Sequence, residues 1–283
     1  MWDIADHYIW VGLLLLFIVS FFVPKKEGMS KKTAEKTAKA YRGRHQYQTV
    51  TPQAFPKNDL AYYEDTQHLL EERGFRLLGD LENLTLKEIH PNMMTFIRCM
   101  TSADGTISAG IYDVRYTGWI RLLQLVRLIP KKLQMLDLET EFNDGTFLCT
   151  SNSKDLDQLD APPAIRYIQY PQDTDLMDLL NVHCGVIAQW TAQNENYTPL
   201  RVSTLEEGLE AQHRMQDLKN IHRQEVGLLT REEMQRIAGG KMTHGAEEML
   251  REHQKLSSGE LHVEKPTHHK EYTDHGDDLQ SDS

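Results

Sequence analysis

The longest apolar stretch of the chain lies near its N-terminus, where sixteen consecutive residues, Tyr8–Val23, carry no charge. A helix of that length spans about 24 Å, and Ile4 and Ala5 extend it toward the roughly 30 Å of a bilayer core. The pattern predicts a transmembrane anchor over 8–24, preceded by a short extracytoplasmic N-terminus at 1–7. Its principal residues are Tyr8, Trp10, Leu13, Leu16, Phe17, Phe21, Phe22 and Val23.

A cleaved secretory signal is the alternative interpretation of this stretch. Such a signal needs a basic start and a cleavage site between small residues. Here Asp3 and Asp6 precede the apolar run, with neither Lys nor Arg, and the sequence after Phe21 offers no small-x-small site. The membrane anchor is therefore favoured.

Basic residues follow the apolar run and predict its orientation. Residues 25–44 contain eight Lys or Arg against two Glu, beginning with Lys25, Lys26, Lys31 and Lys32. Basic residues beside a span stay on the cytoplasmic side. We therefore expect a single-pass membrane protein with its N-terminus outside and its body in the cytoplasm, joined by a basic linker over 25–57.

The middle of the chain carries the periodicities of an α+β domain, which we place at 58–195. Apolar residues recur at helical spacing from Asp59 to Gly74, and Phe75–Leu81 reads as a strand. Two Asp-Gly turns then join hairpin strands, because glycine accepts the positive φ that the turn needs. The predicted strands are 93–101, 106–114, 133–142 and 146–150, with an edge strand at 164–170 and a closing helix to about residue 190.

Alternation in the second hairpin predicts a sheet with one buried and one solvated face. Leu136, Leu138 and Phe142 share one side. The strand and turn carboxylates are interpreted as solvated; they are Asp104, Asp113, Asp137, Glu139 and Glu141.

The segment between the hairpins, 118–132, is almost wholly apolar apart from a few cations. It is interpreted as a core helix laid across the sheet. The alternative is an interfacial helix that dips into the inner leaflet with its cations toward the headgroups. The residues of that second interpretation are Trp119, Arg121, Arg127, Lys131 and Lys132.

The last third of the chain predicts a helical extension over 196–256. The capping boxes Ser203–Glu206 and Thr230–Glu233 mark two helix starts, and a third helix is expected from about residue 244. The first of these helices has few large apolar residues, so we expect it to project from the core. The tail at 257–283 has seven carboxylates, two lysines and few apolar residues, which predicts an acidic disordered segment.

Charge and cysteine content narrow the class of protein. The net charge is −11 although residues 25–44 are basic, so the rest of the chain is strongly acidic. Nucleic-acid binding calls for a basic stripe, and we expect none. The three cysteines are far apart, as in a reducing compartment rather than a disulfide framework.

No motif predicts a catalytic, cofactor or metal site. Histidines gather near the C-terminus without the spacing of a metal centre. His183 and Cys184 are neighbours on a predicted helix and point about 100° apart, so we interpret them as a packed histidine and a buried thiol. No glycine-rich phosphate loop is present. Whether the chain is an enzyme stays open, with a non-enzyme favoured.

Together these elements predict an α+β fold: an N-terminal transmembrane helix, an antiparallel sheet packed with helices, a helical extension and a disordered acidic tail. Over about 75–190 the order of elements resembles profilin-like and longin-like sensor and adaptor folds. The first functional hypothesis is a membrane-anchored cytoplasmic scaffold or adaptor, with the lipid bilayer through 8–24 and an unidentified protein as partners. The alternative is a tethered ligand-sensing or enzymatic domain with a pocket between the sheet and the helix at 118–130.

Overall fold

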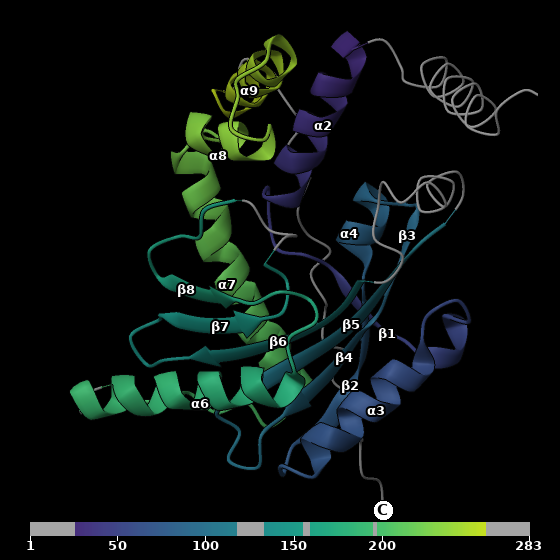
Figure 1. Cartoon of the computed structure of the whole chain (residues 1–283), viewed down its shortest axis with the longest axis vertical. Helices are drawn as coiled ribbons and strands as arrows, with labels where there is room; N and C mark the ends of the chain where they lie inside the picture. The colour runs from purple at the N-terminus through teal and green to yellow at the C-terminus, as the bar shows by residue number, and fades with distance from the viewer. Residues whose placement is uncertain (1–25, 118–132, 155–158, 195–196, 259–283) are drawn as a thin grey trace, which may run out of the picture.

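The computed structural model describes residues 26–117, 133–154, 159–194 and 197–258 (Figure 1). The predicted anchor at 8–24, with Lys25, lies outside these residues, as do the predicted interfacial segment from Trp119 to Lys132 and the tail after residue 258. Within the described ranges, no helix is both long enough and apolar enough to cross a bilayer.

The described chain is α+β, as predicted, and is built on an eight-stranded sheet. Seven strands run in the order β1-β2-β4-β5-β6-β7-β8, and β3 pairs with β5. Their bounds are β1 Tyr47–Thr49, β2 Arg76–Asn83, β3 Met93–Met94, β4 Ile97–Thr101, β5 Ser108–Tyr116, β6 Leu133–Glu141, β7 Phe147–Ser151 and β8 Ile165–Gln169.

The sheet is mixed, which corrects the prediction of an antiparallel sheet. All neighbouring strands are antiparallel except β7 and β8, which run parallel with Phe147 opposite Ile165. Strand β8 therefore enters the sheet at the same end as β7. A tight hairpin there would have reversed the chain. The prediction that this strand lies at an edge is confirmed.

Both predicted Asp-Gly hairpins are confirmed, and they join β4 to β5 and β6 to β7. Gly105 and Gly145 adopt φ values of +76° and +83°, which a residue with a Cβ rarely accepts. In the first turn, Asp104 Oδ1 accepts hydrogen bonds from the backbone N–H and the hydroxyl of Thr106. The second turn repeats both contacts. The recurrence of Asp-Gly-Thr in the sequence thus encodes one turn used twice.

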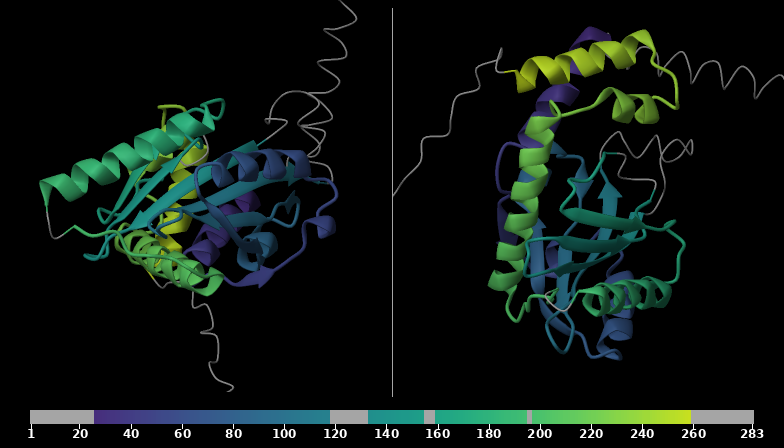
Figure 2. Two further views of the ribbon diagram at one scale, coloured as in Figure 1. Left: turned by 90° about the horizontal axis from the view of Figure 1, so that it is seen from below. Right: turned by 90° about the vertical axis from the view of Figure 1, so that its left-hand side faces the viewer.

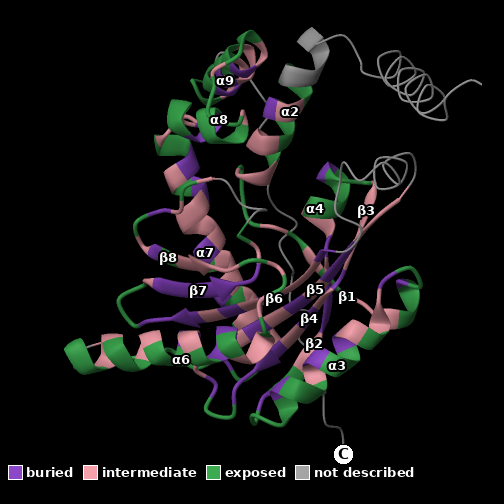
Figure 3. Cartoon of the chain, viewed as in Figure 1, coloured by how far each residue is buried: buried purple, intermediate pink, exposed green. Residues whose placement is uncertain are grey.

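Helices cover both faces of the sheet (Figure 2). Helices α3 (Leu60–Glu71) and α6 (Leu176–Gln193) pack on one face, over a core that includes Tyr63, Leu136 and Leu179. Helix α7 (Leu205–Glu225) lies on the other face, where Met215 packs with residues of β7 and β8. The strands between them are largely buried (Figure 3).

Two predictions fail because of α7. The helix does not project from the core: its own residues Ala211 and Met215 are buried against the sheet. A narrow apolar stripe on the helix is enough for this contact, because the sheet supplies the other apolar surface. The sheet face opposite the main core is consequently not left to solvent. Glu141 on that face is only 8% exposed. Asp113, at the margin of the α3 side, is 0% exposed and pairs with Arg115.

A helical arm stands at one end of the sheet and is formed by α2 (Lys26–Ala40), α8 (Arg231–Ile237) and α9 (His244–Ser257). Helix α2 lies within the segment predicted as a basic linker, and it packs against α9. Lys31 and Lys32 are exposed on it. The arm has its own small core, with Leu229, Met234, Ala246 and Leu250. A short helix, α4 (Leu84–Ile89), and a 3-10 turn at Pro52–Ala54 complete the described elements.

The capping boxes predicted for the last third of the chain are present, one of them displaced. The box at Thr230 is confirmed, with its hydroxyl bonded to the backbone N–H of Glu233. The first box is formed by Thr204 and Glu207, one residue later than predicted. Ser203 takes part only through its backbone N–H, which donates a hydrogen bond to the Glu207 carboxylate. Helix α7 therefore begins at Leu205.

Candidate functional site

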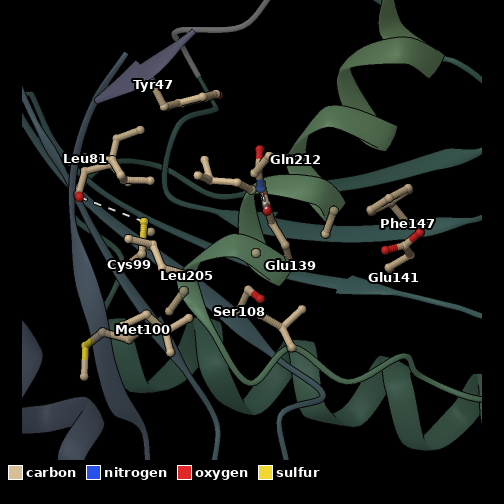
Figure 4. Close-up of a pocket in the computed structure, with 18 of the residues that line it drawn as sticks. Tyr47, Leu81, Cys99, Met100, Ser108, Glu139, Glu141, Phe147, Leu205 and Gln212 are labelled. Carbon is tan, nitrogen blue, oxygen red and sulfur yellow. Dashed lines mark hydrogen bonds between the residues drawn. The ribbon is translucent and has the colours of Figure 1, made fainter. Parts of the chain in front are cut away.

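A cavity lies between the sheet and α7 (Figure 4). It has a volume of about 80 Å³. Strands β1, β2, β4, β5, β6 and β7 supply its floor, and the first two turns of α7 with the preceding segment supply its roof. Its polar or chemically distinctive residues are Tyr47, Cys99, Thr106, Ser108, Tyr112, Glu139, Glu141 and Gln212.

Small residues open the space under α7. Gly110 on β5 leaves room for the ring of Tyr112, because a Cβ on Gly110 would come within 2.9 Å of the Tyr112 hydroxyl oxygen. On the helix, Gly208 and Ala211 line the cavity instead of large side chains. The face of α7 toward the sheet therefore carries small residues among large ones, and the small residues leave a space in an otherwise closely packed interior.

Glu139 is the acidic centre of the cavity. It extends from β6 toward Gln212 of α7, whose amide nitrogen donates a hydrogen bond to its Oε2 (Figure 4). Burial raises the pKa of Glu139, and the Lys219 ammonium and the Gln212 hydrogen bond only partly oppose that rise. A carboxylate whose pKa rises on folding is one whose charge is incompletely compensated by its surroundings.

The two tyrosines and the cysteine of the cavity keep their protons at neutral pH. Burial, with a contribution from Glu139, raises the pKa of Tyr47 to about 12 and that of Cys99 to about 12. Burial also raises the pKa of Tyr112 well above its ordinary value. Since the thiolate is the reactive form of cysteine, Cys99 is unsuited to nucleophilic chemistry. These groups can pack against a ligand or hydrogen-bond it.

A bidentate ion pair lies beside the cavity, at the lining residue Glu141. Arg214 of α7 donates from Nε and Nη2 to the two carboxylate oxygens of Glu141, over 2.7 and 2.6 Å. Paired geometry of this kind is stronger than a single contact. The charge of Glu141 is thereby compensated, and α7 is tied to the end of β6.

The same helix connects the cavity to the arm. Gln212 contacts Glu139, and Gln216, one turn further along α7, donates a hydrogen bond of 3.3 Å to the carbonyl of Ala40 at the end of α2. Arg44, just after α2, pairs with Asp217 at 2.8 Å. Helix α7 therefore roofs the cavity with its first two turns and, one turn later, contacts the end of α2 and the residues just after it.

At its far end α7 is joined to α8 by a buried ion pair. Arg223 is 2% exposed and Glu233 0% exposed, and their charged groups lie 2.7 Å apart. Arg223 also donates to the carbonyl of Asp160 at 2.6 Å. Displacement of α7 would therefore act on α8 and on the loop at 159–162 together.

Sequence reasoning placed a pocket elsewhere and missed the residues of this one. The expected pocket involved 118–130, which lies outside the described residues, whereas the cavity found is roofed by α7. Glu139 was assigned to a solvated face. The sequence contains two signals: an acidic strand segment, LETE, and a later helix with small residues and glutamines. Nothing in a single sequence shows that these two segments lie against each other.

The histidine–cysteine neighbours on α6 divide as helix geometry requires. His183 is buried and hydrogen-bonds the hydroxyls of Thr140 and Thr150 at 3.0 and 2.9 Å. Burial lowers its pKa to about 3, so it is a neutral packed histidine, as expected. Cys184 is exposed, and the prediction of a buried thiol is wrong for it. No group of His, Cys, Asp and Glu in the described residues has the arrangement of a metal site.

Comparison with models of protein families, with curated proteins and with solved structures finds no significant match to this chain. The topological resemblance to profilin-like and longin-like folds gains no support from these comparisons. Function is therefore argued from the cavity and its surroundings alone.

Proposed function

We propose that this chain is a membrane-anchored receptor for a small ligand, which binds beneath α7. The observation that carries the proposal is the cavity between the sheet and α7, lined by apolar side chains around an incompletely compensated carboxylate, Glu139. Apolar walls with a few convergent polar groups are the usual composition of a ligand site. The membrane part of the proposal rests on the apolar run at 8–24.

Binding is favoured over catalysis by the state of the groups in the cavity. The Cys99 thiol has a pKa of about 12, and no histidine is among the described lining residues. A nucleophile needs an adjacent base or a lowered pKa, and neither accompanies Cys99 here. The residues instead provide shape, hydrogen bonds and one negative charge.

The contacts of α7 suggest how binding is communicated. A ligand that displaces the Gln212 side chain from Glu139 acts on α7 one turn before Gln216, which donates a hydrogen bond to the carbonyl of Ala40 of α2. We propose that the occupied and empty cavity favour different positions of α7 relative to α2. A ligand shifts such an equilibrium only through its different affinity for the two positions.

The adaptor hypothesis remains a proposal with weaker support. The exposed large apolar side chains in the described chain are Leu69, Leu77, Leu86, Leu200, Ile221 and Ile237. They lie on α3, β2, α4, the segment before α7, α7 itself and α8. A docking surface for a protein requires such side chains to gather in one patch, and their distribution over six segments does not indicate one.

Filling the cavity tests the receptor proposal. Gly208→Leu places a large side chain on the roof, where a Cβ meets only Val202 Cγ1 at 3.5 Å. Gly185→Leu on α6 is the matched control, because a Cβ there meets nothing within 4 Å. Both replace a glycine inside a helix and gain helix propensity by a similar amount.

Each full-length variant is purified in nanodiscs from its membrane, and small molecules released on denaturation are identified by mass spectrometry. We expect one compound enriched with wild type and Gly185→Leu and lost from Gly208→Leu. Circular dichroism verifies that all three are folded. An identical small-molecule profile for the three proteins would contradict the proposal.

The membrane assignment has its own test. We expect the full chain to stay with membranes during alkaline extraction, and a chain lacking residues 1–24 to be released. Release of the full chain would show that 8–24 is not an anchor, while leaving ligand binding to the experiment above.

A further inference from the structure

The cavity under α7 contains carboxylates and no cation. Its described lining includes Glu139 and Glu141 but neither Lys nor Arg. Glu141 is paired with Arg214. Glu139 accepts a hydrogen bond from Gln212 and forms no ion pair within the described residues. The local charge is therefore negative and belongs mainly to Glu139.

Lys219 is the cation whose field reaches Glu139, and it does not compensate the burial. It lowers the pKa of Glu139 less than burial raises it, so the net shift is upward. The Lys219 ammonium lies 5.5 Å from the centre of the Tyr167 ring, outside the cavity lining. A partly buried carboxylate in this condition is stabilised in its charged form by a cation that reaches it directly.

Aromatic rings form part of the same wall. Tyr47 lines the cavity from β1, and Tyr112 lines it from β5 with its ring against Gly110. The face of a tyrosine ring attracts cations, and the interaction strengthens when water is excluded. A carboxylate combined with aromatic walls is the chemistry by which proteins recognise substituted ammonium groups.

We propose that the ligand of this cavity is a small organic cation, an amine or a methylated ammonium compound, with Glu139 as its counter-ion and Tyr47 and Tyr112 as aromatic walls. This inference rests on the proposed receptor function and specifies its ligand class. The ammonium group takes the place of the Gln212 amide at Glu139, which is the displacement that moves the contact between α7 and β6.

The size of the cavity limits the ligand. A volume of about 80 Å³ corresponds to roughly five to eight water-sized spheres. Ethylammonium and tetramethylammonium are of this order of size, choline is at the upper limit, and longer polyamines and nucleosides exceed it. The neutral compound 3,3-dimethylbutan-1-ol has the shape of choline without its charge, and it separates charge recognition from shape.

The test is isothermal titration calorimetry on the full-length chain in nanodiscs, after removal of small molecules by dialysis. The probes are ethylammonium, tetramethylammonium, choline and 3,3-dimethylbutan-1-ol. Glu139→Gln removes the charge while retaining an oxygen that accepts the Gln212 hydrogen bond. Glu64→Gln, at an exposed position on α3, is the control with the same change in net charge. Thermal unfolding verifies that both variants fold.

We expect at least one of the three cations to bind wild type and Glu64→Gln, at least tenfold more tightly than the neutral alcohol, and to lose at least tenfold in affinity with Glu139→Gln. Equal binding of choline and the alcohol, or equal binding by the two variants, overturns the cation inference. So does the absence of binding by all three cations. If Gly208→Leu nonetheless loses a co-purified neutral or anionic compound, the receptor function stands and only the ligand class is wrong.

Discussion

The buried pair between Arg223 and Glu233 offers the most quantitative test of how α7 is joined to the arm. The guanidinium and the carboxylate are 2% and 0% exposed and lie 2.7 Å apart. Glu233 also accepts hydrogen bonds from the backbone N–H groups of Asp160 and Thr230, each at 2.7 Å. Removing one partner of a pair this deeply buried leaves an uncompensated charge, which costs about 3–5 kcal/mol.

We therefore expect Arg223→Met to lower the free energy of unfolding by about 3–5 kcal/mol, a large part of the stability of an ordinary domain. Glu233→Gln keeps a side-chain oxygen but leaves the buried Arg223 charge without a counter-ion, so it should cost a similar amount. The double variant Arg223→Met/Glu233→Gln has no unpaired charge, so it should lose clearly less than the sum of the single losses.

Urea unfolding of the full chain in detergent, followed by far-ultraviolet circular dichroism, measures the three losses. Arg231→Met is the control, because its pair with Glu247 is exposed, with 61% and 47% of the two side chains accessible. That change should cost less than about 1 kcal/mol. A loss of that small size in Arg223→Met, or strict additivity in the double variant, would refute the reasoning.

Three further predictions concern single side chains. Burial lowers the pKa of His183 from 6.5 to about 3, so between these pH values the unfolded chain binds a proton that the folded chain does not. The melting temperature of wild type should therefore fall as the pH is lowered from 6.5 toward 3. The melting temperature of His183→Gln should fall less over the same range. Gly110→Ala should cost about 1–3 kcal/mol in urea unfolding, because its Cβ would approach the Tyr112 hydroxyl oxygen to 2.9 Å, whereas Gly185→Ala should cost nothing; equal effects would contradict the close packing. A thiol reagent at neutral pH should modify Cys184, which is exposed, faster than Cys99 and Cys149. Burial raises the pKa of all three thiols, that of Cys99 to about 12 and that of Cys149 well above its ordinary value. Equal rates for the three thiols in the folded chain would contradict this difference in exposure.

Local patterns in the sequence predicted most of the described elements. The Asp-Gly turns predicted both hairpins, because the turn needs a positive φ at Gly105 and at Gly145, and the residue type at that position alone satisfies this need. The box at Thr230 likewise marked the start of α8. Such signals depend on neighbours along the chain and survive without knowledge of the tertiary structure.

Features that depend on segments distant in the sequence were missed. Glu141 reads as a solvated residue until Arg214, on a helix more than seventy residues later, is seen to cover it. The parallel pairing of β8 depends on the path of the preceding connection and leaves no periodic signal. The cavity was unforeseen for the same reason, since Glu139 and Gln212 come from segments that only the fold brings together.

We propose above all that a small molecule occupies the space between β6 and α7. An experimental structure of the full chain, purified without dialysis and solved at a resolution that shows bound ligands, tests it most directly. We expect density for a compact non-protein molecule in contact with Glu139 and bordered by Tyr47 and Gly208. A cavity closed by side chains of α7, with no such density, would contradict it.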